Sequence, residues 1–96
     1  MEIKERGALE MILDLATKDT FLQAQIDKFT KLKNEGIIDS VKSAVIGSIY
    51  LYAFNSYINI ISEPSEKIEK IEKDFDEAFL RRVPEILSKI NMLLNL

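Results

Sequence analysis

The chain has 96 residues, of which 47% are hydrophobic and 30% charged, and 13 basic against 16 acidic side chains give a formal net charge of −3. These values are typical of one globular domain over residues 1–96 rather than of a disordered chain, and they disfavour binding to nucleic acid or anionic membranes. The absence of Cys and His removes disulfides, thiolate nucleophiles and the usual zinc ligands, so we expect no enzyme, no metal site and no cofactor.

Two amphipathic helices are predicted at the start of the chain. The first spans about residues 2–17, and its apolar face is formed by Ala8, Leu9, Met11, Ile12, Leu15 and Ala16. A second helix is predicted over residues 21–33, because Thr20 and Gln23 have the spacing of a capping box. Gly36 follows it and is the residue type that commonly ends a helix.

A third helix is expected to lie at the centre of the fold. Residues 43–62 carry no charge, and Asp39 and Ser40 in front of them are good helix caps, whereas Pro64 behind them disfavours helical geometry. The run is long enough to cross a bilayer, but its Ser and Asn residues favour a buried helix of a soluble protein. Its apolar arc is wider than the stripe of about 100° that a surface helix buries. We therefore expect several helices, or a second copy of the chain, to cover it.

The two sides of this third helix are expected to make different contacts. The core should be formed by an apolar arc through Ile46, Tyr50, Phe54, Tyr57 and Ile61. A polar but uncharged stripe on the other side is expected to face a protein partner or a second copy, and it contains Ser48, Asn55 and Asn59. The apolar end of the chain is expected to dock into a groove, which adds Leu93 and Leu94 to the predicted interface.

A fourth helix is expected after a turn at Pro64, with Ser65 as its cap. Its predicted core positions are Ile68, Ile71, Phe75, Ala78 and Phe79. The apolar spacing resumes beyond Pro84, so the chain is predicted to be an all-α bundle of four helices, or of five if Pro84 splits the last one. Arg82 falls near the apolar face, and we expect the kink to turn its side chain outward.

No catalytic or phosphate-binding motif is found. Asp74, Asp76 and Glu77 lie close together in the sequence, but their spacing matches no calcium or di-iron site and indicates a solvated face. The three glycines are isolated, which excludes a glycine-rich phosphate loop. A set of cations is the feature that would indicate phosphate contacts if the fold gathered them, and it consists of Lys28, Lys31, Lys33, Lys42, Arg81 and Arg82.

These features favour a non-catalytic interaction protein, a small helical subunit or adaptor that forms homo-oligomers or docks into a larger assembly. One alternative is a nucleic-acid-associated helical subunit of a ribonucleoprotein, as the small subunits of CRISPR effector complexes are. Another is a small viral or plasmid-encoded inhibitor of a host protein. No small-molecule substrate and no membrane span are expected, and the start of the chain has no secretory signal, which favours the cytoplasm. The abundance of Ile, Lys and Glu is typical of proteins from a thermophile or from an AT-rich genome.

Overall fold

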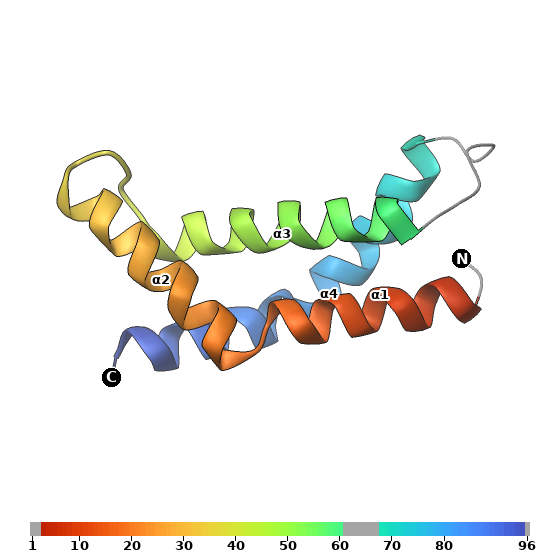
Figure 1. Ribbon diagram of the computed structural model, residues 1–96, viewed down its shortest axis with the longest axis horizontal. Coiled ribbons are helices and arrows are strands. Elements are labelled where there is room, and N and C mark those ends of the chain that lie inside the picture. Colours follow the sequence, from red (N-terminus) through yellow and green to blue (C-terminus); the bar gives the residue numbers. More distant parts are fainter. Residues whose placement is uncertain (1–2, 61–67, 96) are drawn as a thin grey trace.

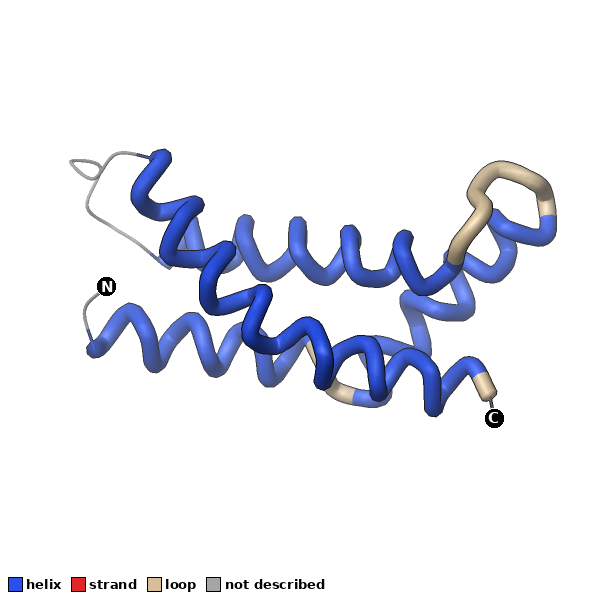
Figure 2. The backbone as a smooth tube through the Cα atoms, turned by 180° about the vertical axis from the view of Figure 1, so that it is seen from behind, coloured by secondary structure: helices blue, strands red, loops and turns tan. Residues whose placement is uncertain are grey.

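The computed structural model describes residues 3–60 and 68–95. These form four helices: α1 (Ile3–Ala16), α2 (Asp19–Asn34), α3 (Val41–Ile60) and α4 (Ile68–Leu94). The prediction of an all-α four-helix bundle is confirmed. α1 and α3 run in opposite directions beside each other, while α2 and α4 cross them on opposite sides (Figure 1). The view from behind brings α4 to the front (Figure 2). The bundle is elongated, with principal extents of 44 × 23 × 18 Å.

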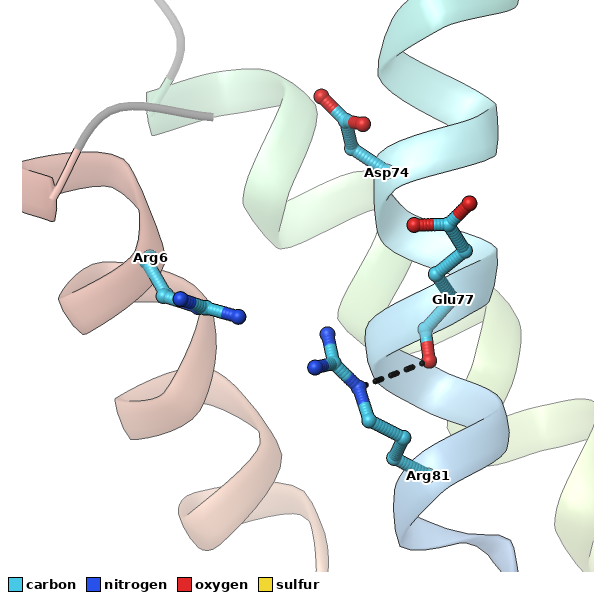
Figure 3. A pocket seen from close by; sticks show the side chains of 4 residues that line it. All are labelled: Arg6, Asp74, Glu77 and Arg81. Carbon is cyan, nitrogen blue, oxygen red and sulfur yellow. Dashed lines mark hydrogen bonds between the residues drawn. The ribbon is translucent and has the colours of Figure 1, made fainter.

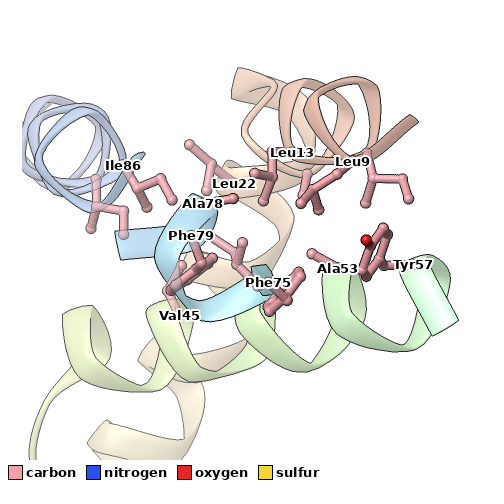
Figure 4. Close-up of a cluster of buried hydrophobic side chains, with 14 of the residues drawn as sticks. Leu9, Leu13, Leu22, Val45, Ala53, Tyr57, Phe75, Ala78, Phe79 and Ile86 are labelled. Carbon is pink, nitrogen blue, oxygen red and sulfur yellow. The ribbon is translucent and has the colours of Figure 1, made fainter. Parts of the chain in front are cut away.

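α3 lies at the centre of the bundle, as its composition predicts, because it packs against each of the other three helices. Side chains from all four helices meet in one apolar core (Figure 4). α3 contributes a buried line with a spacing of four residues, namely Val41, Val45, Ile49, Ala53 and Tyr57. Phe75 of α4 lies against this line, and its ring contacts those of Tyr50, Phe54, Tyr57 and Phe79.

Some predicted core positions are wrong. Met11 and Leu15 are exposed, whereas the predicted residues Leu9, Ile12 and Ala16 are buried together with Leu13, which was not predicted. The buried face of α1 is rotated by part of a turn from the predicted one, because the position of α3 decides which residues are covered. Ile68 is also exposed, whereas Ile71 and the following predicted core residues of α4 are buried. The first turn of α4 rises above the end of α3 in Figure 1, so it lacks the neighbour that covers the later turns.

The connection from α2 to α3 follows the residue chemistry of its ends. Gly36 has a φ of +77°, its N–H bonds to the carbonyl of Lys33, and the N–H of Ile37 bonds to the carbonyl of Leu32. This pair of bonds is a Schellman motif, which ends α2 as predicted. The Ser40 side chain accepts a 3.1 Å hydrogen bond from the N–H of Ser43, which confirms Ser40 as the cap of α3.

The predicted capping box at Thr20 is wrong. α2 begins at Asp19, and the residue at its cap position, Lys18, makes no side-chain capping bond. Thr20 is therefore already inside the helix, and Gln23 donates a 2.9 Å bond forward to Asp27 instead. An acidic residue in the first turn complements the positive end of the helix dipole, which favours a start at Asp19.

α4 is one continuous helix with Pro84 inside it, so the alternative of five helices is wrong. The helix changes direction along its length (Figure 2). Pro84 lacks the N–H that would bond to the carbonyl four residues earlier, and its ring crowds that carbonyl, which is the usual cause of such a bend. The bend lets the two halves of α4 follow different neighbours. The predicted cap Ser65 lies outside the described residues.

Candidate interaction surface

Arg82 lies between α4 and α1 rather than in solvent, and the prediction that the kink turns it outward is wrong. Its side chain is 16% exposed and forms ion pairs of 2.8 Å with Glu10, 2.8 Å with Asp14 and 3.0 Å with Glu85. Burial lowers the pKa of the Arg82 guanidinium, but the hydrogen bonds that it donates to Asp14 and Glu10 outweigh burial, and the pKa rises above its ordinary value. The site therefore joins two helices and holds a permanently charged group.

A polar pocket of about 200 Å³ lies beside this ion-pair site, also between α1 and α4. Arg6 of α1 and Arg81 of α4 point toward each other across it, and Asp74 and Glu77 line its α4 wall (Figure 3). Arg81 donates a 3.3 Å bond to the main-chain oxygen of Glu77. Two cations and two carboxylates balance one another here, so the pocket has no excess charge that would attract a phosphate or a metal ion.

A smaller set of contacts joins α3 to α4 on the other side of the bundle. Tyr50, Phe79 and Leu80 line an apolar hollow of about 290 Å³, and the Tyr50 hydroxyl donates a 2.6 Å hydrogen bond to Asp76. This bond, together with burial and the charges of Asp76 and Glu72, raises the pKa of Tyr50 to about 12. Leu80 is 66% exposed at the edge of the hollow.

α3 has one side that no other described helix covers fully. On one flank, Ser48 and Tyr52 contact α2 through a 2.9 Å hydrogen bond to Gln25 and a ring contact with Phe21. On the opposite flank, Tyr50 contacts α4. The residues between these flanks are Ala44, Gly47, Leu51, Phe54, Asn55 and Ile58, and we call them the outer face of α3.

The outer face is uncharged and largely apolar. Leu51 at its centre is 60% exposed, Gly47 and Asn55 are exposed, and the others are half-buried. A helix whose exposed side carries no charge is unusual in a chain with 30% charged residues. The polar stripe predicted from the sequence includes Asn55 but not Gly47 or Leu51. The signal that indicates them is a second apolar line on α3, with alternating steps of three and four residues.

The predicted interface residues lie in three different environments. The Ser48 hydroxyl is engaged by Gln25 within the chain. Asn55 belongs to the exposed outer face, and Asn59 is exposed beside it. Leu93 is half-buried and packs against the core, while Leu94 is exposed at the end of α4.

The predicted phosphate contacts do not form one patch among the described residues. Lys28, Lys31 and Lys33 are exposed on α2, and Lys42 is half-buried at the start of α3. Arg81 lines the polar pocket beside Arg6, and Arg82 is occupied by three carboxylates.

In residues 3–60 and 68–95, no group of three or more acidic side chains is arranged to hold a metal ion. None of the helices in this part of the chain has the length and apolarity needed to cross a membrane.

The fold and this surface define a class of protein, a small four-helix bundle whose central helix presents an uncharged outer face. Comparison with protein-family models, curated proteins and solved structures finds no match that would narrow the class further. The function therefore has to be argued from the surface itself.

Proposed function

We propose that this chain is a non-catalytic interaction protein, a small helical subunit or adaptor that binds another protein surface through the outer face of α3. The observation that carries this proposal is Leu51, which is 60% exposed at the centre of an uncharged helix face. Contiguous exposed apolar surface in soluble proteins commonly marks a partner site.

The composition of the outer face supports a protein partner in particular. Leu51 offers an exposed apolar side chain, half-buried Phe54 and Ile58 extend the apolar surface beside it, and Asn55 offers an amide that can bond across a contact. Nucleic acids bind through cations that touch phosphates, and the outer face has none. The charged groups around Arg82 pair with each other, and the pocket beside Arg6 is lined by two cations and two carboxylates, so neither place has excess charge for a substrate.

Site-specific photocrosslinking tests the proposal. A photoreactive amino acid at position 51 is expected to form covalent adducts with protein in the cells that produce the chain. The same amino acid at Ser88, exposed on α4, is the matched control. Adducts at 51 and not at 88 would support the proposal. Equal labelling at both positions, or none, would overturn it.

The two alternative functions remain proposals with their own tests. An inhibitor of a host protein could use the same outer face, and the identity of the crosslinked protein would reveal it. A ribonucleoprotein subunit would rely on the lysines of α2, and its binding to oligonucleotides should weaken steeply as salt is raised.

A further inference from the structure

The spacing of the outer face is the spacing of a helix-packing seam. Its apolar members are separated by three, four, three and four residues, and they are Ala44, Gly47, Leu51, Phe54 and Ile58. Such alternation places side chains in a line that packs against another helix at close range. α3 thus carries two lines of apolar residues. One is buried in its own core, and the other lies on the outer face, where Gly47 and Leu51 are exposed while Phe54 and Ile58 also pack against the border of the core.

Side-chain size changes systematically along this second line. Ala44 and Gly47 are small and lie on the N-terminal side of Leu51, whereas Phe54 and Ile58 are large and lie on the C-terminal side. If a second such line is placed on it in the opposite direction, small residues face large ones throughout. A parallel arrangement would instead set Phe54 against Phe54 and leave a gap between the two Gly47 residues. Alternation of small and large side chains across facing positions is what close packing requires.

Gly47 makes no close packing contact with the part of its own chain that the structure describes. A Cβ atom built at this position meets no atom within 4 Å, and the residue lies in the middle of a regular helix. Glycine at such a position destabilises a helix by up to about 1 kcal/mol relative to alanine. Close approach of another backbone at Gly47 would account for it.

We infer that the outer face of α3 packs against the outer face of a second copy of the chain, with the two α3 helices antiparallel and Leu51 at the two-fold axis. The inference rests on the proposed function, because it names the partner of the same surface. In this arrangement Leu51 meets Leu51, Gly47 lies opposite Asn55 and Phe54, and Ala44 lies opposite Ile58. The same patch serves both copies, as a two-fold contact requires.

The charges at the two ends of α3 are complementary in this arrangement. The C-terminal part of α2 lies at the start of α3, on the opposite side of the bundle from α4, and the first turns of α4 lie at the end of α3 (Figures 1 and 2). Residues 28–33 include three lysines and no acid, whereas residues 68–77 include five acids and two lysines. Antiparallel pairing brings the basic end of one copy and the acidic end of the other to the same end of the paired α3 helices, on opposite sides of them. Dimer affinity should therefore fall as ionic strength rises.

Disulfide crosslinking tests the inference directly, because the chain has no Cys of its own. Leu51→Cys should form a disulfide-linked dimer under mild oxidation. Ile58→Cys should not crosslink to itself, since seven residues on each side of the axis separate the two copies by about 21 Å along the helices. Ile58→Cys mixed with Ala44→Cys should crosslink. Ser88→Cys, exposed on α4, controls for random collisions.

Two substitutions test the interface without depending on crosslinks. Gly47→Ala should weaken dimerisation by about tenfold or more, because two added methyl groups enter the closest contact. The variant should retain its helical circular dichroism, since the added Cβ meets nothing within its own chain. Asn55→Lys should give a folded monomer, because each lysine would be placed against Gly47 of the other copy and its charge would be buried in an uncharged contact. Ser88→Lys should remain dimeric.

Each result separates the inference from the proposed function. Light scattering should give twice the 11.0 kDa mass of one chain, and a mass of 11.0 kDa at all concentrations would overturn the inference. Self-crosslinking of Ile58→Cys would also overturn it, because that result indicates a parallel pair. If the chain is monomeric but position 51 photocrosslinks to a different protein, the inference fails and the proposed function stands. If nothing crosslinks at 51, both fail.

Discussion

The hydroxyl of Tyr50 donates a 2.6 Å hydrogen bond to the carboxylate of Asp76, and this bond joins α3 to α4 across 26 positions of the sequence. The Tyr50 ring lies nearly perpendicular to the stacked rings of Phe75 and Phe79, each with its centroid 5.2 Å away. One side chain therefore contributes both to the aromatic core and to a polar contact at its border. Because the bond favours the neutral phenol, it links the stability of the bundle to pH.

Tyr50 is expected to titrate about two pH units above an ordinary tyrosine, with a pKa of about 12 against 10.0. Between these values the unfolded chain loses the proton and the folded chain keeps it, so the free energy of unfolding falls as pH rises through this window. Below pH 10 the contribution of Tyr50 is fully present and does not change with pH. Ultraviolet absorbance of the phenolate should show a late step that Tyr50→Phe removes. Asp76→Asn should move that step toward 10, and an unchanged titration would contradict the hydrogen bond.

Arg82→Ala is expected to lower the free energy of unfolding by about 1–2 kcal/mol. Three ion pairs are lost, but the half-exposed carboxylates of Glu10 and Glu85 regain water, which limits the effect. Urea denaturation measures the difference. Arg81→Ala is the control, because Arg81 is exposed and bonds to a main-chain oxygen of its own helix, and its effect should stay within about 0.5 kcal/mol.

Phe75→Ala is expected to cost about 3–5 kcal/mol, because the fully buried ring fills space among four other aromatic side chains. This is a large part of the total stability of about 5–15 kcal/mol that a small domain has. Thermal unfolding followed by circular dichroism should show a much lower midpoint. Met11→Ala, on the exposed side of α1, should change it little, and similar losses for both variants would argue against this core.

Ser40→Ala is expected to destabilise the chain by about 1 kcal/mol, because it removes the acceptor for the N–H of Ser43 at the start of α3. Thr20→Ala is the matched comparison. Thr20 lies inside α2 and does not cap it, so its replacement should have a much smaller effect. Chemical denaturation of the two variants side by side would distinguish a real cap from a residue that only resembles one in the sequence.

Sequence reasoning succeeds here where the cause is local. The end of α2 at Gly36 and the start of α3 at Ser40 depend on backbone conformation and on a neighbouring hydroxyl, and both were predictable. The uncharged composition of α3 likewise predicted a central helix. The prediction of a cap at Thr20 was wrong because Asp19, one residue upstream, is also a favourable first residue for a helix. Residue spacing alone does not decide between these two starting points.

The errors have a common physical origin in distant neighbours. Periodicity does not show whether α1 buries Leu13 or Met11, because that choice depends on where α3 lies. Arg82 was predicted to reach solvent because a charge on an apolar face is costly unless it is paired. Its partners Glu10 and Asp14 lie at the opposite end of the chain and meet it only in the folded bundle. The outer face was only partly identified for the same reason. Periodicity indicated that α3 is apolar on two sides, and only the positions of α2 and α4 show which side remains uncovered.

The contacts between the two ends of the chain also affect when the bundle can be completed during synthesis. Arg82 reaches back 72 residues to Glu10, and Lys89 donates a 3.1 Å bond to the carbonyl of Thr17, also 72 residues away. A ribosome adds about 5–20 residues per second, so roughly 4–14 s separate the synthesis of the two ends of each bond. During that interval α1 can meet α2 and α3 but not α4. Closing of the bundle is thus timed by translation rather than by the microseconds in which helices form.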